Sequence, residues 1–171
     1  MMLSKLSIAK IWLALLGLAF LVSCSDAPEK ISFSGKTMGT TYSVTVYSKD
    51  PRHNKEEIQK KVDIVLKRVN AQMSTYDPES ELSQFNQFKS TQPMVISRDL
   101  ERVVNRGLEI AEETEGALDI TVGPLVNLWG FGPQARPEKE PSEEELNAVR
   151  EKTGYQKLRV ENHQLIKDNP D

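Results

Sequence analysis

Twelve consecutive apolar residues, at positions 11–22, lie close to the start of the chain and limit which kind of segment the N-terminus can form. A helix that crosses a bilayer needs roughly 20 such residues, so this run is too short to span one. Lys5 and Lys10 precede the run, and small residues follow it. A basic start, a short apolar run and a small-residue exit are typical of a secretory signal peptide, which is predicted here over residues 1–23.

The exit of this segment contains Cys24, the single cysteine of the sequence. One thiol excludes an internal disulfide, a Cys-x-x-Cys redox pair and a thiolate zinc site. Residues 21–24, with the letters LVSC, resemble the lipobox of bacterial lipoproteins, whose cysteine is diacylated and becomes the first residue of the mature protein. The alternative is a buried or chance cysteine after an ordinary signal peptide. The resemblance implies a lipid on Cys24, with 24–32 as a polar membrane tether and 33–171 as the domain that follows.

The charge balance excludes one broad class of partner. The chain has 22 Lys and Arg against 25 Asp and Glu, a formal charge of −3, and the part after the predicted signal peptide carries −5. A nucleic-acid binder needs a basic surface to displace counterions from phosphate, so this composition argues against nucleic acid. With 38% apolar and 27% charged residues, the chain has the composition of one ordinary domain with a core.

Changes of hydrophobic period along the chain predict alternating strands and helices. Apolar and polar residues alternate over 40–46, as in a strand with one buried face. Helical spacing follows a capping residue in three places: 54–69, 97–111 and 142–149. A short helix is predicted at 82–86, a short strand at 94–96 and a hairpin over 155–167. This order predicts an α+β fold with a mixed, partly antiparallel sheet and flanking helices.

The two longest predicted helices are each expected to bury one face. These faces consist of apolar residues at helical spacing: Ile58, Val62, Val65, Leu66 and Val69, then Leu100, Val103, Val104, Leu108 and Ala111. Gly116 is expected to end the second of them, and Gly154 to end the helix that begins after Ser142. The sequence stops at Asp171 soon after a predicted strand, so we expect it to be the N-terminal part of a longer protein.

Residues 35–37, Gly-Lys-Thr, invite comparison with a nucleotide-binding P-loop. That motif needs a glycine where Lys30 stands, and it opens a helix rather than preceding a strand, so we exclude it. The following Met38 and Gly39, with two threonines after them, suit a loop that approaches a ligand closely. A simple turn into the strand explains the same residues equally well.

Two further segments have the chemistry of a small-molecule site. Tyr76 stands in a polar loop between two predicted helices, where it either offers a stacking surface for a planar ring or fills the helix junction. Asp119 is the one acid in the apolar segment 116–132, so its carboxylate needs a partner. It either binds a ligand, caps the short helix after Gly123, or accepts loop amides.

Other catalytic arrangements find no support in the residues. His53 and His163 both stand in predicted turns, far from a second type of metal ligand, and both are expected to be exposed. No zinc spacing exists, and two turn histidines do not support a Ser/His/Asp or Cys/His set. Trp129, between Leu128 and Gly130, is expected to belong to the core.

Three stretches taken together resemble the ApbE family, bacterial flavin transferases attached to the membrane as lipoproteins. They are, in chain order, 35–42, then 73–78 with 80–82 and 86, then 116–132. The resemblance implies that FAD is split at its pyrophosphate and that its FMN half is attached through a phosphoester to a Thr or Ser of a target protein, with release of AMP. It also implies a divalent metal, usually magnesium, and an inner-membrane location facing the periplasm. The acceptors it implies are subunits of the sodium-pumping NADH:quinone reductase and of Rnf-type complexes.

The resemblance also implies roles for five residues. Met38 and Tyr76 would contact the flavin nucleotide, Tyr76 by stacking, while Ala117, Leu118 and Asp119 would line the FAD site. Leu118 departs from the phenylalanine of many members but keeps an apolar contact.

The family's metal ligands and its catalytic histidine lie in its second half, so neither a catalytic nor a metal-binding residue is assigned in this sequence. We therefore expect the 171 residues alone to bind FAD poorly and to transfer nothing. Two alternatives remain beside the transferase. One is a lipoprotein that binds or hydrolyses FAD without modifying a protein, and the other is an inactive fragment.

Overall fold

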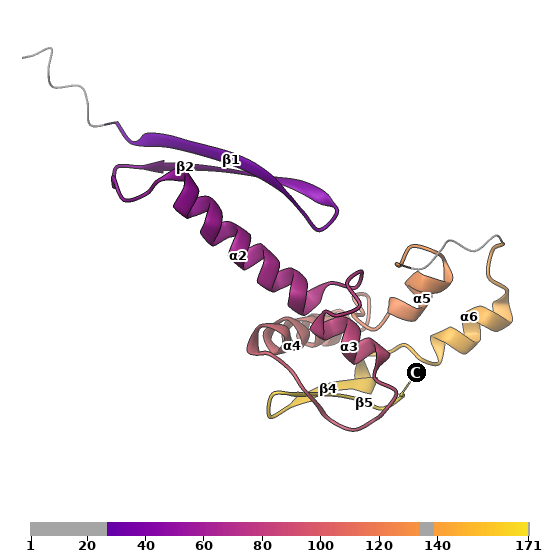
Figure 1. The fold of residues 1–171 in the computed structure, drawn as a ribbon. Coiled ribbons are helices and arrows are strands. Elements are labelled where there is room, and N and C mark those ends of the chain that lie inside the picture. Colours follow the sequence, from indigo (N-terminus) through magenta and orange to yellow (C-terminus); the bar gives the residue numbers. More distant parts are fainter. Residues whose placement is uncertain (1–26, 134–138, 171) are drawn as a thin grey trace, which may run out of the picture. The chain divides into compact units, whose positions relative to one another are not determined.

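The computed structural model describes residues 27–133 and 139–170 (Figure 1). The predicted signal peptide, 1–23, and Cys24 lie outside the described residues. The chain divides into two compact units, one up to Asp63 and one from Ile64, with the boundary inside helix α2 (Lys55–Met73). The other elements are, in order, β1 (Glu29–Thr37), β2 (Thr40–Ser48), α3 (Glu81–Gln87), β3 (Met94–Val95), α4 (Arg98–Glu113), α5 (Gly123–Leu128), α6 (Glu143–Arg150), the 3₁₀ helix η1 (Tyr155–Lys157), β4 (Leu158–Glu161) and β5 (Gln164–Lys167). Within the described ranges, none of the helices has the length and apolar character needed to cross a membrane.

The first unit contains a hairpin in which β1 and β2 pair antiparallel along their full length. The turn between them consists of Met38 and Gly39, which both have positive φ, 49° and 72°. Two such residues form the turn type that matches the twist of paired strands, and glycine adopts this conformation without steric cost. Apolar and polar residues alternate along β1, so Ile31 and Phe33 are buried and the residues between them face solvent.

Strand β1 corrects the predicted extent of the tether. Residues 29–32, assigned to a tether over 24–32, are the first four residues of this strand. Ile31 lies opposite Val46 of β2 and is buried. Because β1 has just two large apolar residues, its alternation is too short to stand out in the sequence, and pairing with β2 supplies the missing stabilisation.

Tyr42 joins the hairpin to the first half of α2. Its hydroxyl donates to Asp63 Oδ1 at 2.5 Å, and this bond raises the pKa of Tyr42. Its ring meets Phe33 edge-on, with 6.4 Å between ring centroids. The ring also lies against Gly35, its partner in register, since a Cβ there would stand 2.6 Å from Tyr42 Cε1. A side chain at position 35 would therefore require the Tyr42 ring to shift from this place.

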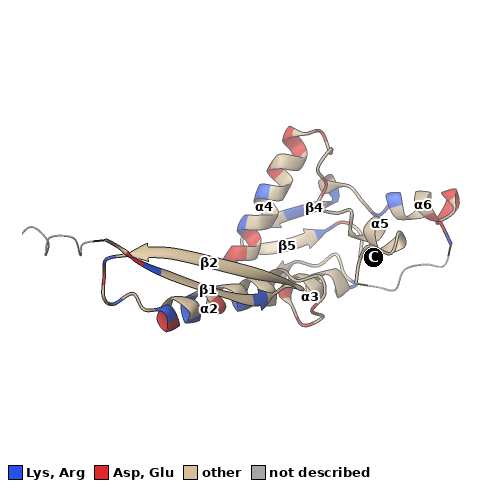
Figure 2. Cartoon of the chain, turned by 90° about the horizontal axis from the view of Figure 1, so that it is seen from above, with Lys and Arg blue, Asp and Glu red and all other residues tan. Residues whose placement is uncertain are grey.

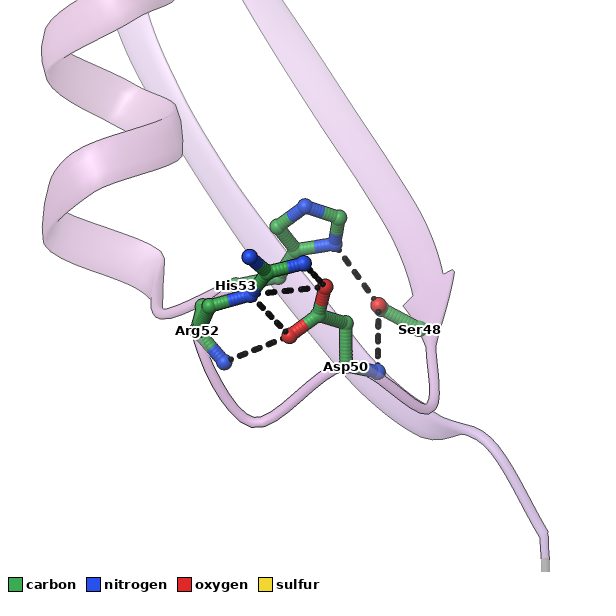
Figure 3. A network of polar contacts seen from close by, with 4 residues as sticks. All are labelled: Ser48, Asp50, Arg52 and His53. Atoms are coloured by element: carbon green, nitrogen blue, oxygen red, sulfur yellow. Dashed lines mark hydrogen bonds and ion pairs between the residues drawn. The ribbon is translucent and has the colours of Figure 1, made fainter.

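Four residues hold the turn from β2 into α2 (Figure 3). The Asp50 carboxylate accepts from Nε and Nη2 of Arg52 at 2.9 and 2.6 Å, and from the Arg52 amide at 3.0 Å. Ser48 Oγ accepts from the Asp50 amide at 3.1 Å and lies 2.8 Å from Nδ1 of His53. The Arg52 guanidinium and amide lower the pKa of Asp50 from 3.8 to about 2.

The second unit is built on one apolar cluster. The cluster combines side chains of α3, α4 and β5 with the residue after β3: Phe85, Ile96, Leu100, Val104 and Leu165. The sheet has the order β3-β5-β4, all antiparallel, and its central strand supplies Leu165, which is 1% exposed. Helices and antiparallel strands in separate stretches confirm the α+β prediction, and every strand pair in the described ranges is antiparallel.

Helix α4 has the predicted cap at both ends. Ser97 caps the N-terminus with its side chain. At the other end the amide of Gly116 donates to Ala111 O at 2.8 Å and that of Glu115 to Glu112 O at 3.1 Å, which is a Schellman motif. The left-handed cap itself is Glu115, with φ 52°, so the predicted stop at Gly116 is confirmed one residue past the cap.

Two residues assigned to buried helix faces are exposed instead. Val65 of α2 is 46% exposed and Val103 of α4 is 52% exposed, whereas the other members of both faces are buried or half-buried. Each stands directly beside another member, Leu66 or Val104, and neighbours on a helix point about 100° apart. The packed side accommodates just one of each pair.

The C-terminal part follows its local signals closely. Ser142 Oγ accepts from the Glu145 amide at 3.3 Å and the Glu145 carboxylate accepts from the Ser142 amide at 2.8 Å, which confirms the predicted capping box of α6. The acidic first turn of α6 and Arg150 in its last turn complement the helix dipole (Figure 2). Strands β4 and β5 turn through Asn162 and His163, both with positive φ, as the predicted hairpin requires.

We predict that Gly35→Ala destabilises the chain by about 1–3 kcal/mol, because the new Cβ pushes the Tyr42 ring away from Asp63. Urea denaturation measures the change in the free energy of unfolding. Gly123→Ala is the matched control, since a Cβ there meets nothing within 4 Å. Equal stability of Gly35→Ala and the unaltered chain would contradict the placement of the ring.

We predict that the Asp50 carboxyl titrates near pH 2 in the folded chain and at a higher pH, closer to its ordinary value, in Arg52→Gln, which keeps the bond from the backbone amide. A lowered folded-state pKa means that the Asp50–Arg52 contact stabilises the turn above about pH 3.8 and loses its effect as pH falls through about 2. Carbon-13 NMR of the carboxyl group measures both values. Lys55→Gln, which removes a charge at the start of α2, should leave the titration unchanged, and an unchanged titration in Arg52→Gln would contradict the assigned cause.

Candidate functional site

The five candidate site residues fall in three places in the fold. Met38 lies at the tip of the hairpin in the first unit, and the other four lie in two loops of the second unit. Ala117, Leu118 and Asp119 are consecutive in the loop after α4, while Tyr76 belongs to the loop between α2 and α3. Among the described residues, no hydrogen bond joins these two loops.

Met38 is both a turn residue and an exposed apolar side chain. It is the first of the two turn residues between β1 and β2, and 52% of it is exposed. The interpretation as a turn is therefore confirmed, and it does not conflict with a ligand contact. The backbone turn holds the methionine side chain out from the strands, where its flexible thioether suits contact with a planar molecule.

Tyr76 is presented to solvent by a loop that is itself well held. The side chain is 70% exposed, so it does not fill the helix junction. Ser74 Oγ accepts from the amides of Tyr76 and Asp77 at 3.1 and 3.0 Å. Asp77 Oδ1 in turn accepts from the Glu79 amide at 3.0 Å, which holds Asp77 and the proline after it in a turn. An exposed ring on a fixed backbone is a preorganised stacking surface.

Two serines that sequence reasoning did not assign any role hold this loop from beneath. Ser80 and Ser83 are buried, and their hydroxyls donate to the carbonyl oxygen of Ser74 at 2.5 and 2.9 Å. Ser80 also accepts from the Ser83 amide and so caps α3. The signal in the sequence was a serine three residues before another at a helix start, which is a capping pattern. That pattern does not reveal that both hydroxyls turn back to Ser74.

Thr114, the residue that follows α4, holds the start of the loop 117–119 by two hydrogen bonds. The amide of Ala117 donates to the Thr114 carbonyl at 3.0 Å, and the amide of Leu118 donates to Thr114 Oγ1 at 3.2 Å. Ala117 is exposed and Leu118 is 43% exposed. The first two candidate residues of this loop are therefore held by their backbones, with their side chains directed to solvent.

Asp119 accepts loop donors and does not cap a helix. Its Oδ1 accepts from the amide and the hydroxyl of Thr121 at 2.8 and 2.6 Å. The N-cap of α5 is Val122, which has no side-chain cap. Of the structural explanations for this acid, acceptance of a loop amide is the observed one. Its second oxygen, Oδ2, makes no hydrogen bond with any described residue and is available to a ligand.

The surrounding segment presents apolar side chains to solvent. Six of them are between 37% and 69% exposed: Leu118, Ile120, Val122, Val126, Trp129 and Phe131. The expectation that Trp129 belongs to the core is wrong, since 40% of it is exposed. Trp129 directly follows α5, and this helix has just six residues, none of them buried. The segment that carries Trp129 is therefore not packed into a core.

Both histidines are exposed, as predicted. His163 Nδ1 lies 2.5 Å from Glu101 Oε2 and so fastens the C-terminal hairpin to α4. His53 lies beside Ser48 and Asp50 (Figure 3), but the Asp50 carboxylate bonds to Arg52. A Ser-His-Asp triad requires the carboxylate to orient the imidazole, so this network is a structural turn.

The described residues do not fit the metal that the resemblance implies. Within 27–133 and 139–170, no three His, Cys, Asp or Glu side chains are grouped so that they could hold a metal ion. Asp119, the one acid of the candidate site, already uses one oxygen for Thr121. We therefore assign no residue of this chain to magnesium and derive no step through a metal. A flavin nucleotide fits better, because it needs an exposed ring surface and hydrogen-bond acceptors, which Tyr76 and Asp119 offer.

Curated relatives of this chain have a common name. This chain is 47% identical over 161 residues to the FAD:protein FMN transferase of Vibrio cholerae serotype O1. The alignment covers 94% of this chain and 48% of the relative. This chain is also 40% identical over 164 residues to the protein of the same name from Escherichia coli K12, covering 89% and 46%. The chain thus spans about half the length of the curated relatives it matches.

Solved structures agree with these relatives. The flavin transferase ApbE from Vibrio cholerae superposes with a TM-score of 0.80 at 48% identity, over 84% of this chain and 46% of that one. The apo form of Pseudomonas stutzeri flavinyl transferase ApbE superposes with a TM-score of 0.80 at 33% identity, over 84% and 48%. A sequence model of the ApbE family matches residues 38–171, which include all five candidate residues. This chain therefore belongs to the ApbE family.

Proposed function

We propose that this chain is the flavin-binding part of an FAD:protein FMN transferase. In the reaction, the hydroxyl oxygen of an acceptor Thr or Ser bonds to the phosphorus of the FMN half of FAD. The bond from that phosphorus to the bridging oxygen breaks, AMP leaves, and the hydroxyl proton is released. The observation that carries the proposal is the exposed Tyr76 ring on a loop fixed by Ser74 and its two buried serines. The names of the relatives support the same activity.

Each candidate residue has a distinct part in binding the nucleotide. Tyr76 stacks on a planar ring of FAD, and the family resemblance implies an apolar contact of Met38 with the nucleotide. Leu118 supplies apolar surface beside the nucleotide, and Asp119 Oδ2 accepts from a hydroxyl or N–H group of it. These residues bind and orient FAD. The displacement itself needs groups that we do not assign to this chain.

The location and the acceptors are part of the same proposal. A lipid on Cys24, which the lipobox resemblance implies, would anchor the chain to a membrane. The family resemblance implies that this is the inner membrane, with the domain in the periplasm. The acceptors would be periplasm-facing subunits of the sodium-pumping NADH:quinone reductase or of an Rnf-type complex. Magnesium dependence would be a property of the whole transferase.

A chimera distinguishes transfer from mere binding. We expect a Vibrio cholerae transferase whose corresponding part is replaced by residues 38–171 of this chain to label an acceptor with FMN, seen as in-gel flavin fluorescence. The parent transferase is the positive control, and the 171-residue chain alone is expected to bind FAD poorly and to leave the acceptor unlabelled. Conversion of FAD to FMN and AMP without labelling would favour the hydrolase alternative. A folded but inert chimera would favour the inactive fragment.

We predict that Tyr76→Ala weakens FAD binding to the chain about tenfold or more, because stacking on an aromatic ring contributes roughly 1–3 kcal/mol per base. Quenching of flavin fluorescence measures the affinity. Tyr76→Phe keeps the ring and should bind nearly as well as the unaltered chain. Tyr47→Ala is the matched control, since Tyr47 is also exposed, at 62%, but lies on β2 outside the candidate loops. Unchanged affinity in Tyr76→Ala would refute the stacking role.

A further inference from the structure

One hydroxyl group connects Asp119 to a distant part of the chain. Thr121 Oγ1 donates to Asp119 Oδ1 at 2.6 Å, and the same oxygen accepts from the amide of Gly154 at 2.7 Å. A threonine hydroxyl has one proton to donate and lone pairs to accept, so both bonds form together. Gly154 directly precedes η1 and has φ 129°, a conformation that favours glycine. The contact therefore joins residues 33 positions apart.

The backbone around Asp119 is fixed independently of this hydroxyl. At one end, a Cβ on Gly116 would stand 3.6 Å from the ring of Tyr155, so the start of the loop lies against η1. In its middle, Ile120 packs on α4, since a Cβ on Gly107 would stand 2.8 Å from Ile120 Cγ2. With the backbone held in this way, the remaining freedom is the orientation of the Asp119 side chain.

Thr121 fixes the orientation of the Asp119 side chain through one carboxylate oxygen. Both of its hydrogen bonds to Asp119, from the amide and from the hydroxyl, go to the same oxygen, Oδ1. The carboxylate is thus held by one oxygen, and Oδ2 makes no hydrogen bond within the described residues. A carboxylate held in this manner keeps one full acceptor for a ligand and loses less side-chain entropy on binding.

We propose that Thr121 is a positioning residue for nucleotide binding, which holds the Asp119 carboxylate so that Oδ2 accepts from a hydroxyl or N–H group of bound FAD. The inference rests on the proposed function, since it names the residue that prepares that site. It assigns Thr121 an effect through Asp119 and no contact with the ligand. A valine of the same shape has no hydroxyl. It would leave the Asp119 carboxylate with one of its two hydrogen bonds, the one from the backbone amide, and would leave the Gly154 amide without its acceptor.

The test compares FAD affinity in a set of variants of the purified chain. Thr121→Val should weaken binding about tenfold, and Thr121→Ser, which keeps the hydroxyl, should stay within about threefold of the unaltered chain. In an Asp119→Ala background, Thr121→Val should cause little further loss, because the group it positions is gone. Thr153→Val is the matched control, since the Thr153 hydroxyl donates to the Arg150 carbonyl and does not contact Asp119.

A second measurement, independent of flavin, is hydrogen exchange at the Gly154 amide, which should be faster in Thr121→Val and unchanged in Thr121→Ser. If the unaltered chain fails to bind FAD at all, the proposed function fails, and this inference falls with it. If the unaltered chain binds and Thr121→Val binds equally well, the inference alone is overturned. It is also overturned if Thr121→Val causes the same loss with and without Asp119, because the effect would then be one of folding.

Discussion

The second unit depends on the exclusion of water from the cluster around Leu100 and Leu165, each 1% exposed. Burying one such leucine stabilises a fold by roughly 1.5–3 kcal/mol. The cluster draws together α3, α4 and the C-terminal hairpin, which are otherwise joined by loops and short turns. Both loops of interest are attached to these elements, since 74–80 leads into α3 and 117–122 leaves α4. Within the second unit, the apolar core therefore sets the positions from which Tyr76 and residues 117–119 project.

In both loops, hydrogen bonds from short polar side chains fix the local conformation. Around Tyr76, the hydroxyls of Ser80 and Ser83 converge on the Ser74 carbonyl, and both serines are buried. Around Asp119, the Thr121 hydroxyl serves as donor and acceptor at once. In each case the holding residue is buried or half-buried and satisfied, while Tyr76 or Leu118 remains exposed. These hydrogen bonds are partly buried, so breaking them costs free energy, and they hold the backbone that carries the exposed groups.

Local features were predicted well because their causes lie within a few residues. The caps at Ser97 and Ser142 follow from side chains that bond to backbone amides a few residues away. The turn at Asn162 follows from the tolerance of asparagine for a positive φ. Strand β1 was not predicted, because its stability comes from β2. Trp129 was misplaced because its exposure depends on what packs against α5. The exposure of Val65 and Val103 also depends on tertiary packing. The helical period predicts which side of a helix packs against the core, and it does not predict how wide the packed surface is.

The sequence by itself determined the helices, the turns, the α+β class and the family, because periodicity, caps and motif order are local or additive along the chain. It also selected Met38, Tyr76 and the segment 117–119 as candidates. Tertiary structure alone decided how those residues are held. The bonds from Ser80 and Ser83 to Ser74, and from Gly154 to Thr121, join residues 6 to 33 positions apart. The sequence does not indicate which distant carbonyl or amide a hydroxyl will bond to, because only tertiary packing brings the two groups within hydrogen-bond distance.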